Sequence, residues 1–258
     1  MVGSADKAPG SEPSPRNGAM ADSLSVARAA APGALISFFL DGPAGRLEAL
    51  LNAGDRDAPY SAMICHPHPS GGGTMNNKVV YHAAKVFSAL GWPVLRFNFR
   101  GTGLSEGVHD GRAEVGDVEA GLEWLARAFS KPIVAAGFSF GAAMGLQACC
   151  RLHSGQGPTV KGFAALGLPT HAPGRVYSYP FLHSCKLPKL FLSGDRDQYG
   201  PEEQLHQVAN AASEPKTLVL IPGAEHFFTG RLPEMQAALG NWLNTTFPPN
   251  PNLARYIP

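Results

Sequence analysis

Net charge, cysteine and long hydrophobic runs are all scarce in this chain of 258 residues. The 21 Lys and Arg residues against 20 Asp and Glu leave a formal net charge of +1, so bulk electrostatics attract neither nucleic acid nor an anionic membrane surface. No apolar stretch approaches the roughly 20 residues that a membrane-spanning helix needs. We therefore expect neither nucleic-acid binding nor stable insertion into a membrane.

The four cysteines show neither a C-x-x-C motif nor the spacing of a disulfide scaffold. They are Cys65, Cys149, Cys150 and Cys185, and each lies in or beside an apolar run. The sequence thus predicts four small, buried thiols in a reducing compartment. Because the N-terminus also lacks the apolar core of a secretory signal, we expect a cytoplasmic protein.

Residues 1–32 are rich in Ala, Pro, Ser and Gly. Arg16 and Arg28 are compatible with an organelle transit peptide, whereas three acidic residues in the same segment argue against one. We interpret the segment as a disordered leader. Whether it has a targeting role stays open, and Met20 is a second candidate for the start of the protein.

From residue 33 to residue 247, apolar runs alternate with helical repeats and predict one domain. The expected strands are 34–41, 46–51, 61–65, 92–99, 133–136, 160–168, 187–192 and 217–221. The expected helices are 77–90, 115–129, 142–152, 202–212 and 233–243. Uninterrupted apolar strands alternating with helices are typical of a mostly parallel sheet covered on both faces. Residues 169–186 fit no element, which leaves room for at most a minimal cap, and the Pro-rich tail 248–258 is predicted to be irregular.

The motif Gly137-Phe138-Ser139-Phe140-Gly141 is the strongest chemical signal in the chain. It follows a short apolar strand and precedes a helical repeat, which is the context of a nucleophile elbow. In such a turn the serine adopts a strained backbone conformation, and small residues two positions before and after let the chain pass itself. We therefore predict that Ser139 is a catalytic nucleophile.

A serine hydroxyl needs a general base and an acid that orients the base. In folds whose nucleophile lies on such an elbow, the order along the chain is Ser, acid, His. His226 follows the last predicted strand, and Asp195 and Asp197 follow the strand before it. We favour Asp197 as the acid and interpret Asp195 as a turn residue, although both side chains would point the same way in an extended loop. Glu225, next to the histidine, is expected to be solvated.

An oxyanion hole requires two N–H donors near the nucleophile. One is expected from the backbone of Phe140, the residue after Ser139. The other is expected from the loop after the third strand, which reads His66-Pro67-His68-Pro69-Ser70-Gly71-Gly72-Gly73. Since proline has no N–H, His68 is the preferred donor, with Ser70 and the glycines as alternatives.

Two further motifs suggest other chemistry but are incomplete. His66 and His68 have the spacing of a metal pair, yet no third ligand or H-E-x-x-H motif accompanies them. In the segment 99–107, a dinucleotide-binding motif starting at Gly101 would need glycine where Glu106 stands. We expect no metal and no cofactor, and we interpret 99–107 as a structural loop near the active site.

Taken together, the motifs resemble those of the α/β-hydrolase superfamily, and more narrowly small bacterial serine hydrolases related to dienelactone hydrolase and the prolyl oligopeptidase catalytic domain. The resemblance covers about 34–247 and rests on His66-Pro67-His68-Pro69, Arg96-Phe97-Asn98-Phe99-Arg100-Gly101, Gly137-x-Ser139-x-Gly141, Gly194-x-x-Asp197 and Glu225-His226-Phe227-Phe228. It implies an α/β-hydrolase fold with about eight strands and a Ser139–Asp197–His226 triad. The elbow carries serine, whereas dienelactone hydrolase itself carries cysteine.

The resemblance implies hydrolysis of a carboxylic ester through an acyl-enzyme. Because residues 169–186 cannot enclose a long chain, we predict a carboxylesterase for small-molecule esters of short to medium acyl length. Its apolar pocket is expected to be lined by Phe138, Tyr177, Tyr179 and Phe227. The alternatives are a thioesterase or peptidase on the same site, or a non-catalytic protein that binds a ligand there. The physiological ester, the stereochemical preference and the oligomeric state stay open, with a homodimer as one alternative.

Overall fold

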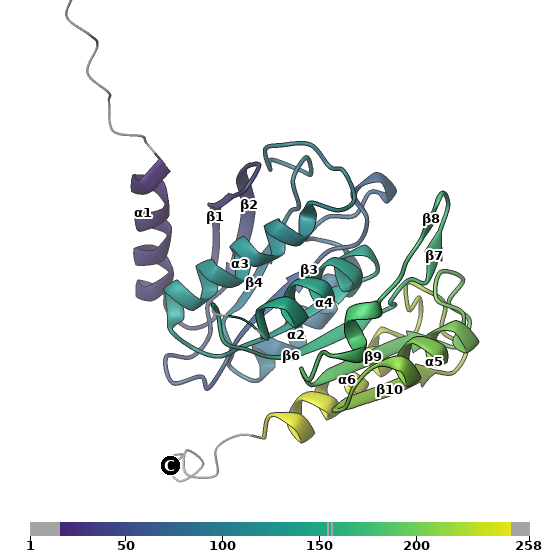
Figure 1. The fold of residues 1–258 in the computed structure, drawn as a ribbon. Helices are drawn as coiled ribbons and strands as arrows, with labels where there is room; N and C mark the ends of the chain where they lie inside the picture. The colour runs from purple at the N-terminus through teal and green to yellow at the C-terminus, as the bar shows by residue number, and fades with distance from the viewer. Residues whose placement is uncertain (1–15, 154, 156, 249–258) are drawn as a thin grey trace, which may run out of the picture.

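The structure is a computed structural model that describes residues 16–153, 155 and 157–248. An eight-stranded sheet runs through its centre (Figure 1). In spatial order the strands are β1 (Leu35–Gly42), β2 (Gly45–Asn52), β4 (Val94–Phe97), β3 (Ser61–Cys65), β5 (Ile133–Phe138), β6 (Val160–Leu166), β9 (Lys189–Gly194) and β10 (Lys216–Ile221). Strand β2 is antiparallel to both of its neighbours, and the other pairs are parallel. This mostly parallel architecture is the one that the alternating sequence pattern predicted, and it agrees with the α/β-hydrolase fold that the resemblance implied.

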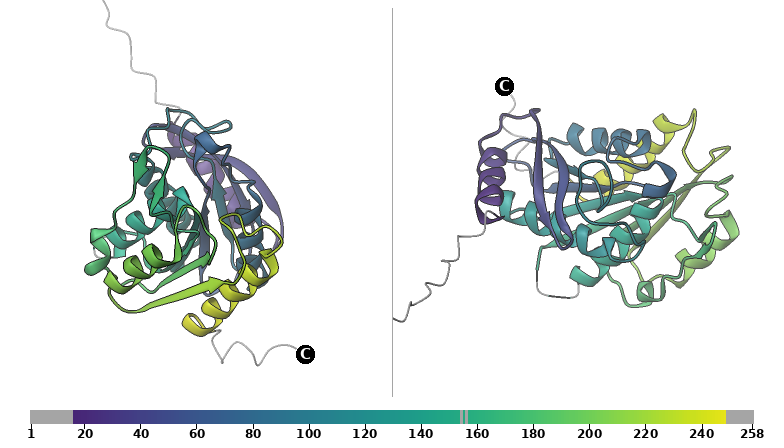
Figure 2. Two further views of the ribbon diagram at one scale, coloured as in Figure 1. Left: turned by 90° about the vertical axis from the view of Figure 1, so that its right-hand side faces the viewer. Right: turned by 90° about the horizontal axis from the view of Figure 1, so that it is seen from above.

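Helices cover both faces of the sheet (Figure 2). One face carries α2 (Lys78–Ala89) and α6 (Leu232–Thr246). The other carries α1 (Arg16–Ala29), α3 (Glu114–Phe129), α4 (Phe140–His153) and α5 (Glu202–Ala211). The sheet is therefore buried on both sides, which explains why its central strands are apolar throughout rather than alternating.

Local sequence signals account for the limits of the helices. At the start of α2 the Asn77 side chain accepts a hydrogen bond from the Val79 amide, 2.9 Å away, and so satisfies one of the free N–H groups of the first turn. The helix ends one residue before Leu90, and Gly91 then adopts a positive φ of 74°. Both signals lie within one or two positions of the boundaries predicted from the sequence.

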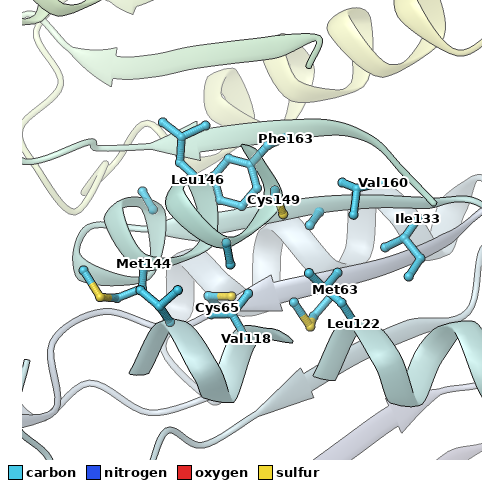
Figure 3. Close-up of a cluster of buried hydrophobic side chains, with 14 of the residues drawn as sticks. Met63, Cys65, Val118, Leu122, Ile133, Met144, Leu146, Cys149, Val160 and Phe163 are labelled. Carbon is cyan, nitrogen blue, oxygen red and sulfur yellow. The ribbon is translucent and has the colours of Figure 1, made fainter. Parts of the chain in front are cut away.

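The core between the sheet and α3 and α4 is built from interdigitating aliphatic, aromatic and sulfur-containing side chains (Figure 3). Met63 and Cys65 point from β3 towards Val118 and Leu122 of α3, and each of the four is buried. Burying an apolar side chain of this size contributes roughly 1.5–3 kcal/mol. This core packs β3 and β5 against α4 and so fixes their relative positions. The ends of these two strands carry the candidate site.

The N-terminal segment departs from the prediction of a disordered leader. Residues 16–29 form α1, in which Leu24 and Ala27 are buried against the core. The indole N–H of Trp124 donates to the Ser23 hydroxyl at 3.1 Å, and Arg28 donates to the carbonyl of Ala128 at 3.1 Å. An Ala-rich composition is compatible with disorder, but alanine is also the best helix former, and packing against α3 decides between the two. Residues 1–15 of the predicted leader and 249–258 of the predicted tail lie outside the described residues.

Two of the four cysteines also depart from the prediction. Cys150 on α4 and Cys185, which precedes β9, form a disulfide across a Cα–Cα distance of 5.5 Å. The 35 residues between them hide this pairing from the sequence, because only tertiary packing brings the two positions together. Cys65 and Cys149 are buried free thiols as predicted, and burial raises the pKa of both. The disulfide removes one of the two observations behind the expected cytoplasmic location.

The segment between β6 and β9 is more ordered than expected. It contains a short hairpin of β7 (His171–Ala172) and β8 (Arg175–Val176), and then the 3₁₀ helix η2 (Pro180–His183). The hairpin projects from the edge of the fold at the carboxyl end of the parallel strands (Figure 1). Within the described part of the chain, no helix has the length and apolar character needed to cross a membrane.

Candidate active site

Ser139 occupies the turn between β5 and α4 with a positive φ of 56°, which is unusual for a residue with a side chain. Its neighbours at −2 and +2 explain why the turn needs glycine. A side chain at Gly137 would overlap the carbonyl of Gly141, and one at Gly141 would overlap the carbonyl of His66. The Ser139 amide donates to the carbonyl of Leu166 at 2.9 Å and holds the turn against β6. This close packing aims the hydroxyl out of the carboxyl edge of the sheet.

His226 reaches the serine from the loop that follows β10. Its Nε2 atom lies 2.9 Å from the Ser139 hydroxyl oxygen. The carboxylate of Glu225 accepts from the amides of Phe227 and Thr229, at 3.0 and 2.8 Å, and so holds the loop in shape. Glu225 was expected to be solvated, and its role in the loop is not visible from the sequence.

Asp197, and not Asp195, lies against the histidine. Both carboxylate oxygens of Asp197 are 2.9 Å from His226 Nδ1. They also accept from the Ser193 hydroxyl at 2.8 Å and from the Tyr199 amide at 2.8 Å. Asp195 instead accepts from the Gly223 amide at 2.7 Å and joins two loops at the surface.

The surroundings of Asp197 keep it ionised. Burial acts to raise its pKa, but the hydrogen bond and charge of His226, together with the Tyr199 amide and the Ser193 hydroxyl, outweigh burial and hold the pKa below its usual value. An ionised Asp197 accepts the Nδ1–H proton of His226 and leaves the Nε2 lone pair directed at Ser139. The arrangement is that of a nucleophile, a base and an orienting acid in one hydrogen-bonded chain.

The loop after β3 lies beside the hydrogen-bonded side chains of Ser139 and His226. His68 caps the 3₁₀ turn η1 (Pro69–Gly71), and its carbonyl accepts from the amides of Gly71 and Gly73. Its ring packs edge-on against the ring of Phe140, with 4.9 Å between centroids. His68 therefore lies beside Phe140, the residue that follows Ser139, and the backbone N–H groups of both stay the predicted oxyanion donors.

His66 is part of the scaffold. It is buried, its Nε2 accepts from the Phe99 amide at 2.9 Å, and its Nδ1 faces the Pro67 carbonyl at 2.7 Å. Burial lowers the pKa of His66 to about 4, so the ring is neutral at physiological pH. Since both ring nitrogens already have backbone partners, this side chain is unsuited to bind a metal ion.

The segment 99–107 is a structural loop, as expected. Arg100 and Asp117 form a buried ion pair with an N–O distance of 2.7 Å. The Ser105 hydroxyl donates to the Asn98 carbonyl at 2.7 Å and accepts from the Glu48 amide at 2.9 Å. The ion pair connects the loop to α3, and the Ser105 bonds connect it to β2, so these groups hold the loop in place rather than forming a cradle for phosphate.

A pocket of about 370 Å³ opens above Ser139 and His226. Its other lining residues are Pro67, His68, Ser70, Gly71, Gly73, Asn77, Pro169, Ala172, Pro173, Tyr177, Tyr199 and Phe227. One wall is the polar backbone of the loop after β3, and the opposite wall is apolar and comes from the β7–β8 region. The volume is near the lower end of the 300–1,000 Å³ typical of small-molecule sites.

Two of the four residues predicted to line the pocket, Tyr177 and Phe227, do so. Phe138 is fully buried beneath His226, with 4.9 Å between ring centroids, because side chains of β5 alternate into the core. Tyr179 lines a neighbouring hollow, and its hydroxyl donates to the Pro169 carbonyl at 2.5 Å. Tyr199 also lines the pocket, although the sequence did not predict it. Its ring packs edge-on against the His226 ring, with 4.7 Å between centroids, and only the fold places it there.

Arg175 ties the β7–β8 hairpin to the loop before α3 and to Phe140 at the start of α4. Its guanidinium donates to the Gly111 carbonyl at 2.6 Å. The same group lies over the Tyr177 ring at 4.4 Å and over the Phe140 ring at 5.6 Å. The hairpin therefore acts as a short strap, with the wall residues Ala172, Pro173 and Tyr177 on it or next to it.

Comparison with known proteins gives consistent results. The family model described as "Alpha/beta hydrolase domain" matches residues 61–243. An uncharacterised protein of Rickettsia prowazekii is 36% identical over 218 residues, which cover 80% of this chain and 88% of that protein. A Xanthomonas campestris protein, described as an α/β serine hydrolase without lid, is 30% identical with a TM-score of 0.72 over 86% of this chain and 99% of its own. An α/β serine hydrolase homologue from Coxiella burnetii is 37% identical with a TM-score of 0.70 over 80% and 96%.

Proposed function

The chain belongs to the α/β-hydrolase family and is a hydrolase of that type, and on this premise we propose that it is a serine carboxylesterase for esters of short to medium acyl length. One observation carries the proposal. Asp197, His226 and Ser139 are joined by hydrogen bonds of 2.9 Å at the floor of the pocket. The order Ser, acid, His along the chain supports the same assignment.

The proposed reaction begins with attack of the Ser139 hydroxyl on the ester carbonyl carbon. His226 Nε2 takes the hydroxyl proton, and Asp197 stabilises the resulting imidazolium. The negative charge on the carbonyl oxygen is stabilised by the N–H groups of His68 and Phe140. His226 then gives its proton to the leaving alcohol, and an acyl-enzyme is formed.

Hydrolysis of the acyl-enzyme completes the cycle. A water molecule attacks the acyl carbon while His226 Nε2 accepts its proton. The bond between the acyl carbon and Ser139 Oγ then breaks, His226 returns the proton to Ser139, and the carboxylic acid is released. The proton of Ser139 thus leaves with the alcohol, and water replaces it through His226.

The shape of the pocket supports a small ester as substrate. About 370 Å³ is enough for a short acyl chain and a compact alcohol. Tyr177 and Phe227 offer apolar surface to the acyl group, and the strap at Arg175 limits the length that can be enclosed.

The direct test compares wild-type protein with Ser139→Ala on p-nitrophenyl esters of increasing acyl length, with a fluorophosphonate label as second readout. We expect short esters to be turned over and labelling to occur only with Ser139 present. Ser184→Ala, which alters an exposed serine outside the pocket, should behave as wild type.

Matched ester, thioester and amide substrates distinguish the esterase from the other acyl hydrolases. Faster turnover of the thioester or the amide would replace the carboxylesterase assignment with a thioesterase or a peptidase. A wild-type protein that neither takes the label nor turns over any of the three would indicate a ligand-binding role.

A further inference from the structure

A separate hollow, of about 300 Å³, lies between α2 and the β2–β4 side of the sheet. It is lined by Asn52, Tyr81, Ala84, Lys85, Ser88, Ala89 and Arg96. None of these residues lines the pocket above Ser139. The hollow is on the face that α2 and α6 cover, and the proposed reaction uses no part of it.

Arg96 is the unusual member of this set. It is on β4, with only 4% of its surface exposed, and it points to the same side of the strand as Val94, towards α2. Its terminal nitrogens donate to the Met75 carbonyl at 3.2 Å and to the Asn52 side-chain oxygen at 3.3 Å. In the part of the chain that the structure describes, no carboxylate pairs with Arg96, and its Nε has no hydrogen-bond partner.

An arginine side chain stays protonated in proteins, so this charge is buried without a counter-charge. Burial of an unpaired charge is unfavourable, and buried charges are normally paired or bound to a ligand. Burial lowers the pKa of Arg96, and the Tyr81 phenol acts in the opposite direction. The local electrostatics therefore favour an anion next to Arg96.

Ser88 supplies an independent observation. Its hydroxyl oxygen is buried and, like Arg96 Nε, has no hydrogen-bond partner among the described residues. The two residues that carry these unsatisfied groups line one hollow, although they come from different elements, α2 and β4. Unsatisfied buried polar groups are rare in native structures and call for a specific explanation.

The remaining polar groups of the hollow are also donors. Lys85 and Arg96 each lie 5.9 Å from the centre of the Tyr81 ring, so two cations are close to the same aromatic ring. The oxygen of the Asn52 amide is taken by Arg96, which leaves its NH₂ group available to a ligand. The residues around the hollow thus carry guanidinium, ammonium, hydroxyl and amide donors, beside an aromatic ring.

We propose that this hollow binds a small molecule through an oxyanion, a phosphate or a carboxylate, held by Arg96, Ser88 and Lys85. Arginine binds both groups with charge-assisted hydrogen bonds. The volume exceeds that of a bare oxyanion, and the organic part of the ligand lies against the Tyr81 ring.

Calorimetric titration of the full chain with sodium phosphate, and separately with sodium acetate, tests the proposal at constant ionic strength maintained with chloride. We expect one site per chain for at least one of the two anions. Arg96→Met should raise the Kd at least about tenfold, and Lys85→Met and Ser88→Ala should raise it several-fold, since each removes a charged or hydroxyl donor. Arg151→Met removes an exposed arginine from α4 on the opposite face and should leave the Kd unchanged.

Comparison of the two anions distinguishes a phosphate-bearing ligand from a carboxylate-bearing one. Tighter binding of phosphate assigns the site to a phosphate-bearing ligand, and tighter binding of acetate assigns it to a carboxylate-bearing one. If Arg96→Met does not fold, Ser88→Ala decides the matter, because alanine favours the helix and the change removes only an unpaired hydroxyl. Absence of binding by both anions, or binding that all three variants leave unchanged, would overturn the proposal.

Discussion

His226 presents its Nε2 atom to the Ser139 hydroxyl at 2.9 Å, although 87 residues separate the two along the chain. The contact depends on two loops that follow different strands, β5 and β10, and on the parallel sheet that brings their carboxyl ends to one edge. Changes that disturb either loop should therefore affect catalysis before they affect the fold.

Replacement of Asp197 by asparagine should abolish most of the activity. Asparagine has no charge to stabilise the imidazolium of His226, and its NH₂ group facing Nδ1 favours the wrong tautomer of the ring; a comparable change in a serine protease lowers kcat by about 10⁴-fold. We expect a loss of kcat of about 10³–10⁴-fold with a native circular dichroism spectrum. The matched variant Asp195→Asn, which alters only the hydrogen bond to Gly223, should retain most of the activity. Equal losses in the two variants would contradict the assignment of Asp197.

The loop after β3 can be tested with two glycines. A methyl group at Gly73 would overlap the carbonyl of Pro67, whereas one at Gly71 would face open space. Gly73→Ala should therefore displace the His68 amide and lower kcat by about 10²-fold, the typical effect of losing one oxyanion donor. Gly71→Ala should have a much smaller effect on kcat. A Gly73→Ala enzyme with normal kcat for the p-nitrophenyl esters would argue against an oxyanion hole at this loop.

Buried His66 should make stability depend on pH in the acid range. Its pKa is lowered to about 4 in the folded chain, against about 6.5 when unfolded. Between these values the unfolded state binds the proton and the folded state does not, so the free energy of unfolding falls as the pH falls from 6.5 to 4. His66 thereby lowers the free energy of unfolding by about 3 kcal/mol over this pH range. Above pH 6.5 it causes no change of stability with pH.

Urea unfolding at several pH values measures this effect. His66→Gln should flatten the dependence between pH 4 and 6.5, although it lowers stability at neutral pH by loss of packing. The control, His206→Gln, changes an exposed histidine on α5 and should leave the slope as in wild type. A wild-type slope in His66→Gln would show that other groups cause the acid sensitivity.

The disulfide between Cys150 and Cys185 should be detectable by counting thiols. Denatured, unreduced protein should show two reactive thiols, from Cys65 and Cys149, and reduction should raise the number to four. Cross-linking a loop of this length lowers the entropy of the unfolded chain, so Cys150→Ser with Cys185→Ser should lower the free energy of unfolding by about 2–4 kcal/mol. Four thiols without reductant would mean that the cysteines are reduced under the conditions used.

The fold and much of the candidate site can be read from local patterns. Apolar runs and helical repeats specify β5, α2 and the other central elements, because the sheet is buried on both faces and its strands are continuously apolar. The sequence also singles out Ser139, Asp197 and His226, because the elbow motif and the order of loops are local features. Their catalytic roles are the subject of the proposed tests.

Other features depend on residues that are distant in the chain. The sequence favours Asp197 over Asp195, but the bond that Asp197 makes to His226 depends on how the loop after β9 packs on the loop after β10. The position of Phe138 depends on which way β5 alternates, and the helix α1 depends on its contact with α3. These contacts join distant segments, so a pattern within one segment cannot predict them.

By itself, the sequence determined the order of the eight strands of the main sheet and of the helices between them, the strained serine turn and the residue types of the proposed triad, since each follows from local sterics and hydrophobic periodicity. The tertiary structure alone decided the Cys150–Cys185 pairing, the pocket wall around Tyr177 and the placement of an unpaired Arg96 beside Ser88. The physical reason is that these features join segments far apart in the chain, and their free energy depends on burial and distance in three dimensions rather than on the neighbours of each residue in sequence.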